Sequence, residues 1–84
     1  MSGYEQKDVM APIITNLRDG NVWTTAELLD AIFGELPTQE QEKRYAQVKR
    51  ALESLLRNGT IGRKEMWSPG AAYKHYGWYL EGEA

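Results

Sequence analysis

The stretch VKRALESLLRNGTIGRK, residues 48–64, decides the fold of this chain. Its first part is amphipathic, because its leucines recur at intervals of three and four residues, as one face of a helix requires. Asn58-Gly59 then ends the helix, and the following residues alternate like a strand that carries Arg63 and Lys64. The stretch therefore predicts a long helix followed directly by a basic strand.

The C-terminal part of the chain reads as a β-hairpin. Two strands are expected over residues 61–67 and 73–80, joined by a turn that contains Pro69-Gly70. A two-stranded hairpin is only marginally stable in water, so it must pack on other elements. Val22-Trp23 is short and β-prone, and we expect it to supply a third strand.

Two helices are predicted upstream of the long one. The first carries an apolar stripe, with Asp8 as its N-cap and Asp19-Gly20 at its end. The second begins at a capping box formed by Thr24 and Glu27, and it ends near Gly34.

The third helix is predicted over about residues 38–58, with Thr38 and Gln41 as a second capping box. Its apolar side should be buried and consists of Tyr45, Val48, Leu52, Leu55 and Leu56. Its opposite side should face solvent and carries Lys43, Gln47, Arg50, Ser54 and Arg57. Leu52 and Leu55 are expected to pack against apolar residues of the first two helices, namely Ile13, Leu17 and Ile32.

Length and composition are typical of one small domain. The chain has 84 residues, of which 42% are hydrophobic, and we expect an ordered core over about 8–80 with a flexible tail at 81–84. It has no cysteine, which excludes disulfides and thiolate metal sites. Because no signal peptide pattern or membrane-spanning apolar run is present, we expect a soluble cytoplasmic protein without membrane contact.

Charge is distributed unevenly along the chain, although the net charge is only −2. Residues 1–42 carry two basic and eight acidic groups, a balance of −6, whereas residues 43–76 carry eight basic and two acidic groups, a balance of +6. This split predicts a polarised molecule with one face suited to an anion.

Enzymatic chemistry is not expected. His75 is the only histidine, and neither cysteine nor clustered carboxylates accompany it, so we predict no metal site and no nucleophilic mechanism based on it. Gly59-Thr60-Ile61-Gly62 lacks the lysine and the following helix of a phosphate-binding loop. We therefore expect no cofactor.

The order helix, short strand, helix, helix, hairpin, together with residues 48–64, resembles the small transcription regulators of the winged helix-turn-helix superfamily. The resemblance covers roughly Asp8 to Leu80. It implies an α+β winged helix with three helices, a short strand and a C-terminal β-hairpin wing. It also implies that the third helix enters the major groove through Lys43, Arg44, Gln47 and Arg50, with Ser54 and Arg57 farther along. The wing would meet the DNA backbone or minor groove through Arg63, Lys64 and Lys74.

The resemblance thus leads us to expect a regulator of transcription that binds double-stranded DNA, as a homodimer. Trp67, near the hairpin tip, would be a wedge or docking anchor, or would fold back on the domain.

Two alternatives remain open. Acidic residues crowd the start of the third helix, at Glu35, Glu40 and Glu42, and would oppose phosphates there. They favour a winged-helix module that binds a protein partner in a larger assembly. RNA is the other alternative, with Tyr73, Tyr76 and Trp67 as stacking candidates.

Overall fold

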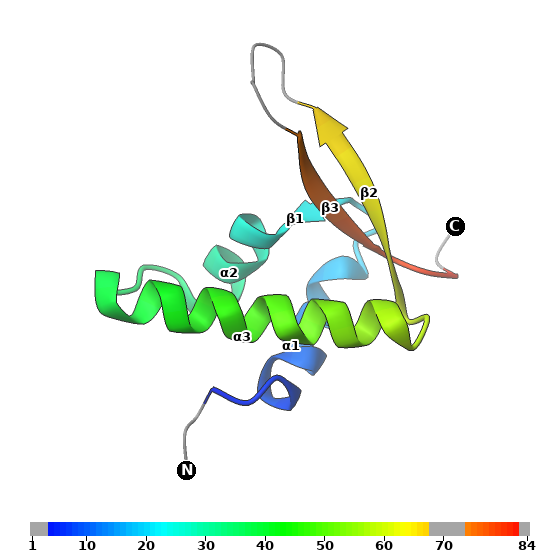
Figure 1. The fold of residues 1–84 in the computed structure, drawn as a ribbon. Helices are drawn as coiled ribbons and strands as arrows, with labels where there is room; N and C mark the ends of the chain where they lie inside the picture. The colour runs from blue at the N-terminus through cyan, green and yellow to red at the C-terminus, as the bar shows by residue number, and fades with distance from the viewer. Residues whose placement is uncertain (1–3, 68–73, 83–84) are drawn as a thin grey trace.

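The described part of the chain forms three helices and three strands, in the order α1, β1, α2, α3, β2, β3 (Figure 1). The computed structural model describes residues 4–67 and 74–82. The helices are α1 (Lys7–Leu17), α2 (Thr25–Phe33) and α3 (Thr38–Arg57), and the strands are β1 (Trp23–Thr24), β2 (Ile61–Trp67) and β3 (Lys74–Leu80). The protein is therefore a small α+β domain, a layout compatible with a winged helix.

The strands form an antiparallel sheet in the order β1-β3-β2. Trp23 of β1 pairs with Trp78, which confirms the predicted third strand with a shift of one residue from Val22-Trp23. β2 and β3 pair from Ile61 opposite Leu80 to Trp67 opposite Lys74. Three predicted features lie outside the described residues. They are the turn at residues 68–72, Tyr73 at the start of the second hairpin strand, and residues 83–84 of the tail.

The core lies where the three helices meet β3. Leu52 and Leu55 of α3 are buried beside Ile13 and Leu17 of α1, and Ile32 packs against the same cluster, as the apolar stripes predicted. Trp78 joins the sheet to this core: its ring is buried, and its indole Nε1 donates a hydrogen bond to Thr25 Oγ1 at 3.0 Å. This anchors the hairpin to the start of α2.

The ends of the helices test the capping predictions. The α2 capping box is confirmed, since the backbone N–H of Glu27 donates to Thr24 Oγ1 at 3.1 Å and that of Thr24 donates to Glu27 Oε1 at 2.8 Å. Asp8 as an N-cap is wrong, because Gln6 holds that position and α1 begins at Lys7, two residues earlier than a cap at Asp8 would place it. The end of α1 is also earlier than predicted, at Leu17.

The second predicted capping box, Thr38 with Gln41, is wrong as well. Pro37 holds the N-cap position of α3, and Gln41 turns back so that its Nε2 donates to Leu36 O at 3.0 Å. Proline fixes φ near the value needed at a helix start, so the Leu36-Pro37 turn begins this helix without a hydroxyl cap. At the other end, Gly59 takes a φ of +85°, which favours glycine.

The outer face of the sheet, turned away from the helices, is closely covered by side chains. A Cβ at Gly62 would lie 2.3 Å from the Tyr79 ring, and one at Gly77 would lie 2.3 Å from Val22 Cγ1. A larger residue at either position would force a neighbouring side chain to shift, because Tyr79 lies directly over Gly62, and Val22 and Met66 lie directly over Gly77. No helix in the described part of the chain has the length and apolar character needed to cross a membrane.

Candidate nucleic-acid interface

A groove of about 610 Å³ lies between α3 and the hairpin, with the start of α2 along one side. We call it the wing groove. Figure 1 shows the hairpin standing away from α3 on the side where α2 also lies. Its lining residues are Thr24 of β1, Thr25 and Ala26 at the start of α2, Tyr45, Lys49 and Glu53 of α3, and Arg63, His75, Tyr76 and Trp78 of the hairpin.

The α3 wall of the wing groove is a single helical row. Tyr45, Lys49 and Glu53 recur every four residues and therefore point the same way from the helix. This row flanks the buried stripe. Tyr45 was expected in the core, and that prediction is wrong, because its side chain is 43% exposed at the edge of the stripe. Lys49 is also exposed and brings a cation into the groove.

The hairpin wall contributes a second cation. The Arg63 guanidinium lies 4.5 Å from the centre of the Tyr76 ring, which holds the charge over an aromatic face. Arg63 is exposed, and Tyr76 is 37% exposed. The register places Arg63 opposite Trp78, so the two side chains share the face of the sheet that packs on the helices at Trp78. Lys49 and Arg63 thus approach one groove from two different elements.

Adjacent strand residues point to opposite faces, so Lys64 does not share the face of Arg63. Lys64 is exposed and pairs with Gly77, on the outer face beside Gly62 and Tyr79. The sequence placed Arg63 and Lys64 together as wing cations, whereas strand geometry directs their side chains to opposite faces of β2. Both residues also border a pocket of about 420 Å³ beside Val22 and Tyr79, but only Arg63 lines the wing groove. The side chains of the remaining wing candidates, Trp67 and Lys74, lie outside the described residues.

The predicted reading face of α3 is found only in part. Lys43, Arg50 and Arg57 are exposed as expected, and Ser54 is half-buried. Gln47 was expected among them, and that prediction is wrong, because its side chain has no exposed surface. Its Nε2 donates to the backbone carbonyl of Glu5 at 2.9 Å. The cause is a segment distant in sequence that covers this part of the helix.

This segment, residues 4–6, runs along one flank of α3 before α1 begins, and we call it the N-terminal strap. The Tyr4 hydroxyl donates to Glu40 Oε1 at 2.6 Å, and Arg50 Nη2 donates to the Tyr4 carbonyl at 3.0 Å. The hydroxyl bond raises the pKa of Tyr4 and lowers the pKa of Glu40, because it favours the neutral phenol and the charged carboxylate. Glu40, one of the acidic residues that argued against DNA, is therefore engaged within the protein.

Arg44 is engaged in the same cluster. Its guanidinium lies 4.5 Å from the Tyr4 ring centre and 4.8 Å from that of Phe33, and its Nε is 3.3 Å from a Glu40 carboxylate oxygen. Its Nη1 also donates to Gln47 Oε1 at 3.0 Å. Arg44, predicted to contact bases, therefore joins the strap to α2 and α3 in this structure.

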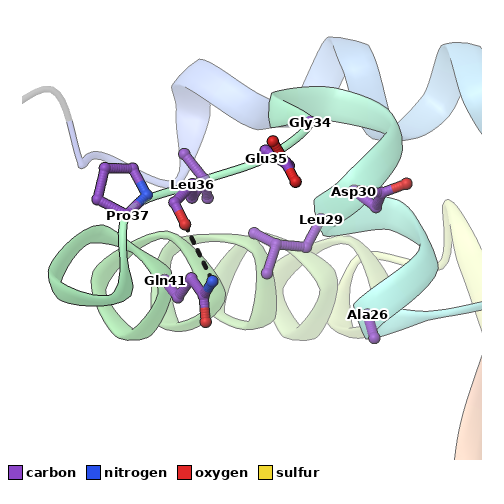
Figure 2. Close-up of a pocket in the computed structure, with 8 residues that line it drawn as sticks. All are labelled: Ala26, Leu29, Asp30, Gly34, Glu35, Leu36, Pro37 and Gln41. Atoms are coloured by element: carbon purple, nitrogen blue, oxygen red, sulfur yellow. Dashed lines mark hydrogen bonds between the residues drawn. The ribbon is translucent and has the colours of Figure 1, made fainter.

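A second pocket, of about 690 Å³, lies at the turn between α2 and α3 (Figure 2). Figure 2 shows the Leu36 carbonyl accepting its hydrogen bond from Gln41 within this turn. The ionisable groups that line the pocket are the carboxylates of Asp30 and Glu35. Because these acids would repel phosphate, this pocket is less suited to a nucleic acid than the wing groove, where two cations, Lys49 and Arg63, accompany one carboxylate, Glu53.

Neither metal chemistry nor any likeness to known proteins adds to the site. Within residues 4–67 and 74–82, no group of three or more metal-ligating side chains comes together. Comparisons of the chain with protein-family models, curated proteins and solved structures gave no significant match.

The sequence analysis did not assign Tyr45 and Lys49 to a binding groove. Their spacing of four residues with Glu53 places the three residues in one row along the helix, and this spacing is visible in the sequence.

Proposed function

We propose that this protein binds double-stranded DNA as a winged-helix regulator of transcription, with α3 toward the major groove and the hairpin along the backbone. One observation carries the proposal: Lys49 of α3 and Arg63 of β2 are both exposed in the wing groove. Two cations on separate rigid elements can contact phosphates on both sides of a duplex groove, and such contacts supply most of the affinity for DNA.

The other groups around this face support the same partner. Lys43, Arg50 and Arg57 extend the positive charge along the exposed side of α3. The start of α2 borders the groove, and the partial positive charge of a helix N-terminus favours an anion. Arg50 is the residue we assign to base reading, because a guanidinium can form two hydrogen bonds with guanine.

Binding to duplex DNA of random sequence tests this proposal, measured by fluorescence anisotropy over a series of salt concentrations. Affinity should fall steeply as salt rises, because cations that neutralise phosphates release counterions. Lys49→Ala should weaken binding, whereas Arg18→Ala, which removes an exposed cation at the end of α1, should not. Equal effects of the two substitutions would place the DNA elsewhere than on the wing groove.

Dimerisation belongs to the same proposal. One domain of this size makes few base contacts, and two-fold symmetry is the common way for such modules to lengthen the site they read. Sedimentation of the protein with and without a selected duplex measures this directly. A complex of one chain per duplex at saturation would contradict the proposed homodimer but not the proposed binding of DNA.

A protein partner is the second candidate, and two exposed tyrosines of the wing groove favour it. Tyr45 and Tyr76 both line the wing groove, and tyrosine is enriched among residues that dominate protein interfaces. Salt separates the two candidates, since an apolar docking surface should hold its partner as ionic strength rises. If the partner is a protein, Tyr76→Ala should weaken binding of that partner more than Lys49→Ala does.

A further inference from the structure

We propose that the N-terminal strap is an autoinhibitory contact: residues 4–6 occupy the cationic flank of α3 in the free protein, and a nucleic acid displaces them. This inference rests on the proposed function. It concerns a different part of α3 from the wing groove, because the strap lies along the flank that carries Gln47, whereas the groove lies along the row of Tyr45 and Lys49.

The strap holds three α3 cations at once. Arg50 gives an N–H to the Tyr4 carbonyl, and the Tyr4 ring lies 4.5 Å from the Arg44 guanidinium and 5.6 Å from Lys43 Nζ. Two of these cations, Lys43 and Arg50, are exposed residues of the face that we assign to the major groove. The strap therefore uses groups that DNA would need.

The strap offers these cations weaker partners than DNA does. The backbone carbonyl of Tyr4 and the aromatic ring are neutral, whereas a phosphate oxygen is charged and forms a shorter and stronger hydrogen bond with a guanidinium. Glu5 adds a carboxylate nearby, but it is exposed, and one of its oxygens lies 3.3 Å from Lys7 Nζ. A polyanion can therefore replace the strap at Arg50 and Lys43.

The strap is also held in a way that permits release. Glu5 and Gln6 are exposed and Tyr4 is half-buried, and contacts at such positions contribute little individually. Gln47 is a fully buried anchor of the strap, and its Nε2 donates to the Glu5 carbonyl at 2.9 Å. Because the strap covers the Gln47 side chain, its amide protons should exchange faster with solvent when the strap opens, so they report the position of the strap.

The experiment combines a pair of strap variants with this reporter. Tyr4→Ala removes both the ring and the hydroxyl, whereas Tyr4→Phe keeps the ring over Arg44 and removes only the bond to Glu40. We expect Tyr4→Ala to raise affinity for a random duplex about three- to tenfold, and Tyr4→Phe to raise it less. In the unmodified protein, saturating duplex should accelerate exchange of the Gln47 side-chain amide, measured by nuclear magnetic resonance.

Three results would contradict the inference, and they separate it from the proposed function. If Tyr4→Ala leaves duplex affinity unchanged or lowers it, the strap does not compete with DNA. If duplex binds the unmodified protein while the Gln47 amide stays protected, the strap remains in place. If neither the unmodified protein nor a folded Tyr4→Ala variant binds duplex at low salt, the proposed function fails, and the autoinhibitory role fails with it.

Discussion

The sheet register allows two neighbouring cations to be compared at one place in the chain. Arg63 and Lys64 are adjacent, both are exposed, and they point to opposite faces of β2. Arg63 lies in the wing groove against Tyr76, whereas Lys64 lies on the outer face opposite Gly77. We expect Arg63→Ala to weaken DNA binding and Lys64→Ala to have little effect.

The magnitude follows from one phosphate contact. Each neutralised phosphate contributes about 0.9 to the slope of log affinity against log salt. Removing the Arg63 contact should therefore lower the slope by about one. If the unmodified protein and the variant bind equally well in 1 M salt, the variant should bind roughly eightfold more weakly than the unmodified protein in 0.1 M salt. Loss of its contact with Tyr76 is a smaller effect, because both side chains are partly in solvent.

The assay is the salt series of duplex affinity for the unmodified protein and the two variants. Circular dichroism provides the control for folding, since both substitutions leave the core residues of the hairpin in place. The reasoning is refuted if Lys64→Ala lowers the slope as much as Arg63→Ala does, because the outer face would then contact the backbone. It is also refuted if neither substitution changes the slope.

Three further predictions concern the fold and its titration. Leu52→Ala should cost about 2–5 kcal/mol in urea unfolding, because the leucine is fully buried; a loss below about 1 kcal/mol would mean that the site refills without a cavity. Thr24→Ala should cost about 1 kcal/mol by removing the capping hydroxyl of α2, and an unchanged midpoint of thermal unfolding would contradict this. The bond from Tyr4 lowers the pKa of Glu40, so the stabilisation from this carboxylate is present above its unfolded pKa and is lost as pH falls through the folded value. Titration of Glu40 followed by nuclear magnetic resonance should therefore show a higher pKa in Tyr4→Phe, and an identical pKa would show that the bond has no such effect.

Local signals in the sequence were sufficient for most of the fold. Thr24 and Glu27 identified the start of α2 because a capping box needs only residues within one turn. The apolar stripe identified Leu52 and Leu55 as core, and the alternation after Gly59 identified β2. Each of these features depends on residues that are close in sequence, so the spacing of residue types along the chain is enough to predict it.

The candidate site depended on contacts between distant segments, which periodicity does not report. Gln47 is polar and lies off the apolar stripe, yet the strap buries it from 42 positions earlier in the chain. Tyr45 lies at the edge of the stripe, where only the path of the hairpin decides between core and groove. Arg63 and Lys64 could have been assigned to opposite faces from strand alternation, but the face that meets the groove required the register with Trp78.

The most direct test of the proposed interface maps a bound duplex onto the domain by backbone amide chemical shifts. Saturating duplex should shift the amides of Lys49, Arg63 and Tyr76 around the wing groove, while those of Ala11 and Thr15 on the exposed side of α1 stay in place. Shifts concentrated on α1, or a spectrum unchanged at low salt and saturating duplex, would contradict the claim that the wing groove and α3 form a DNA-binding face.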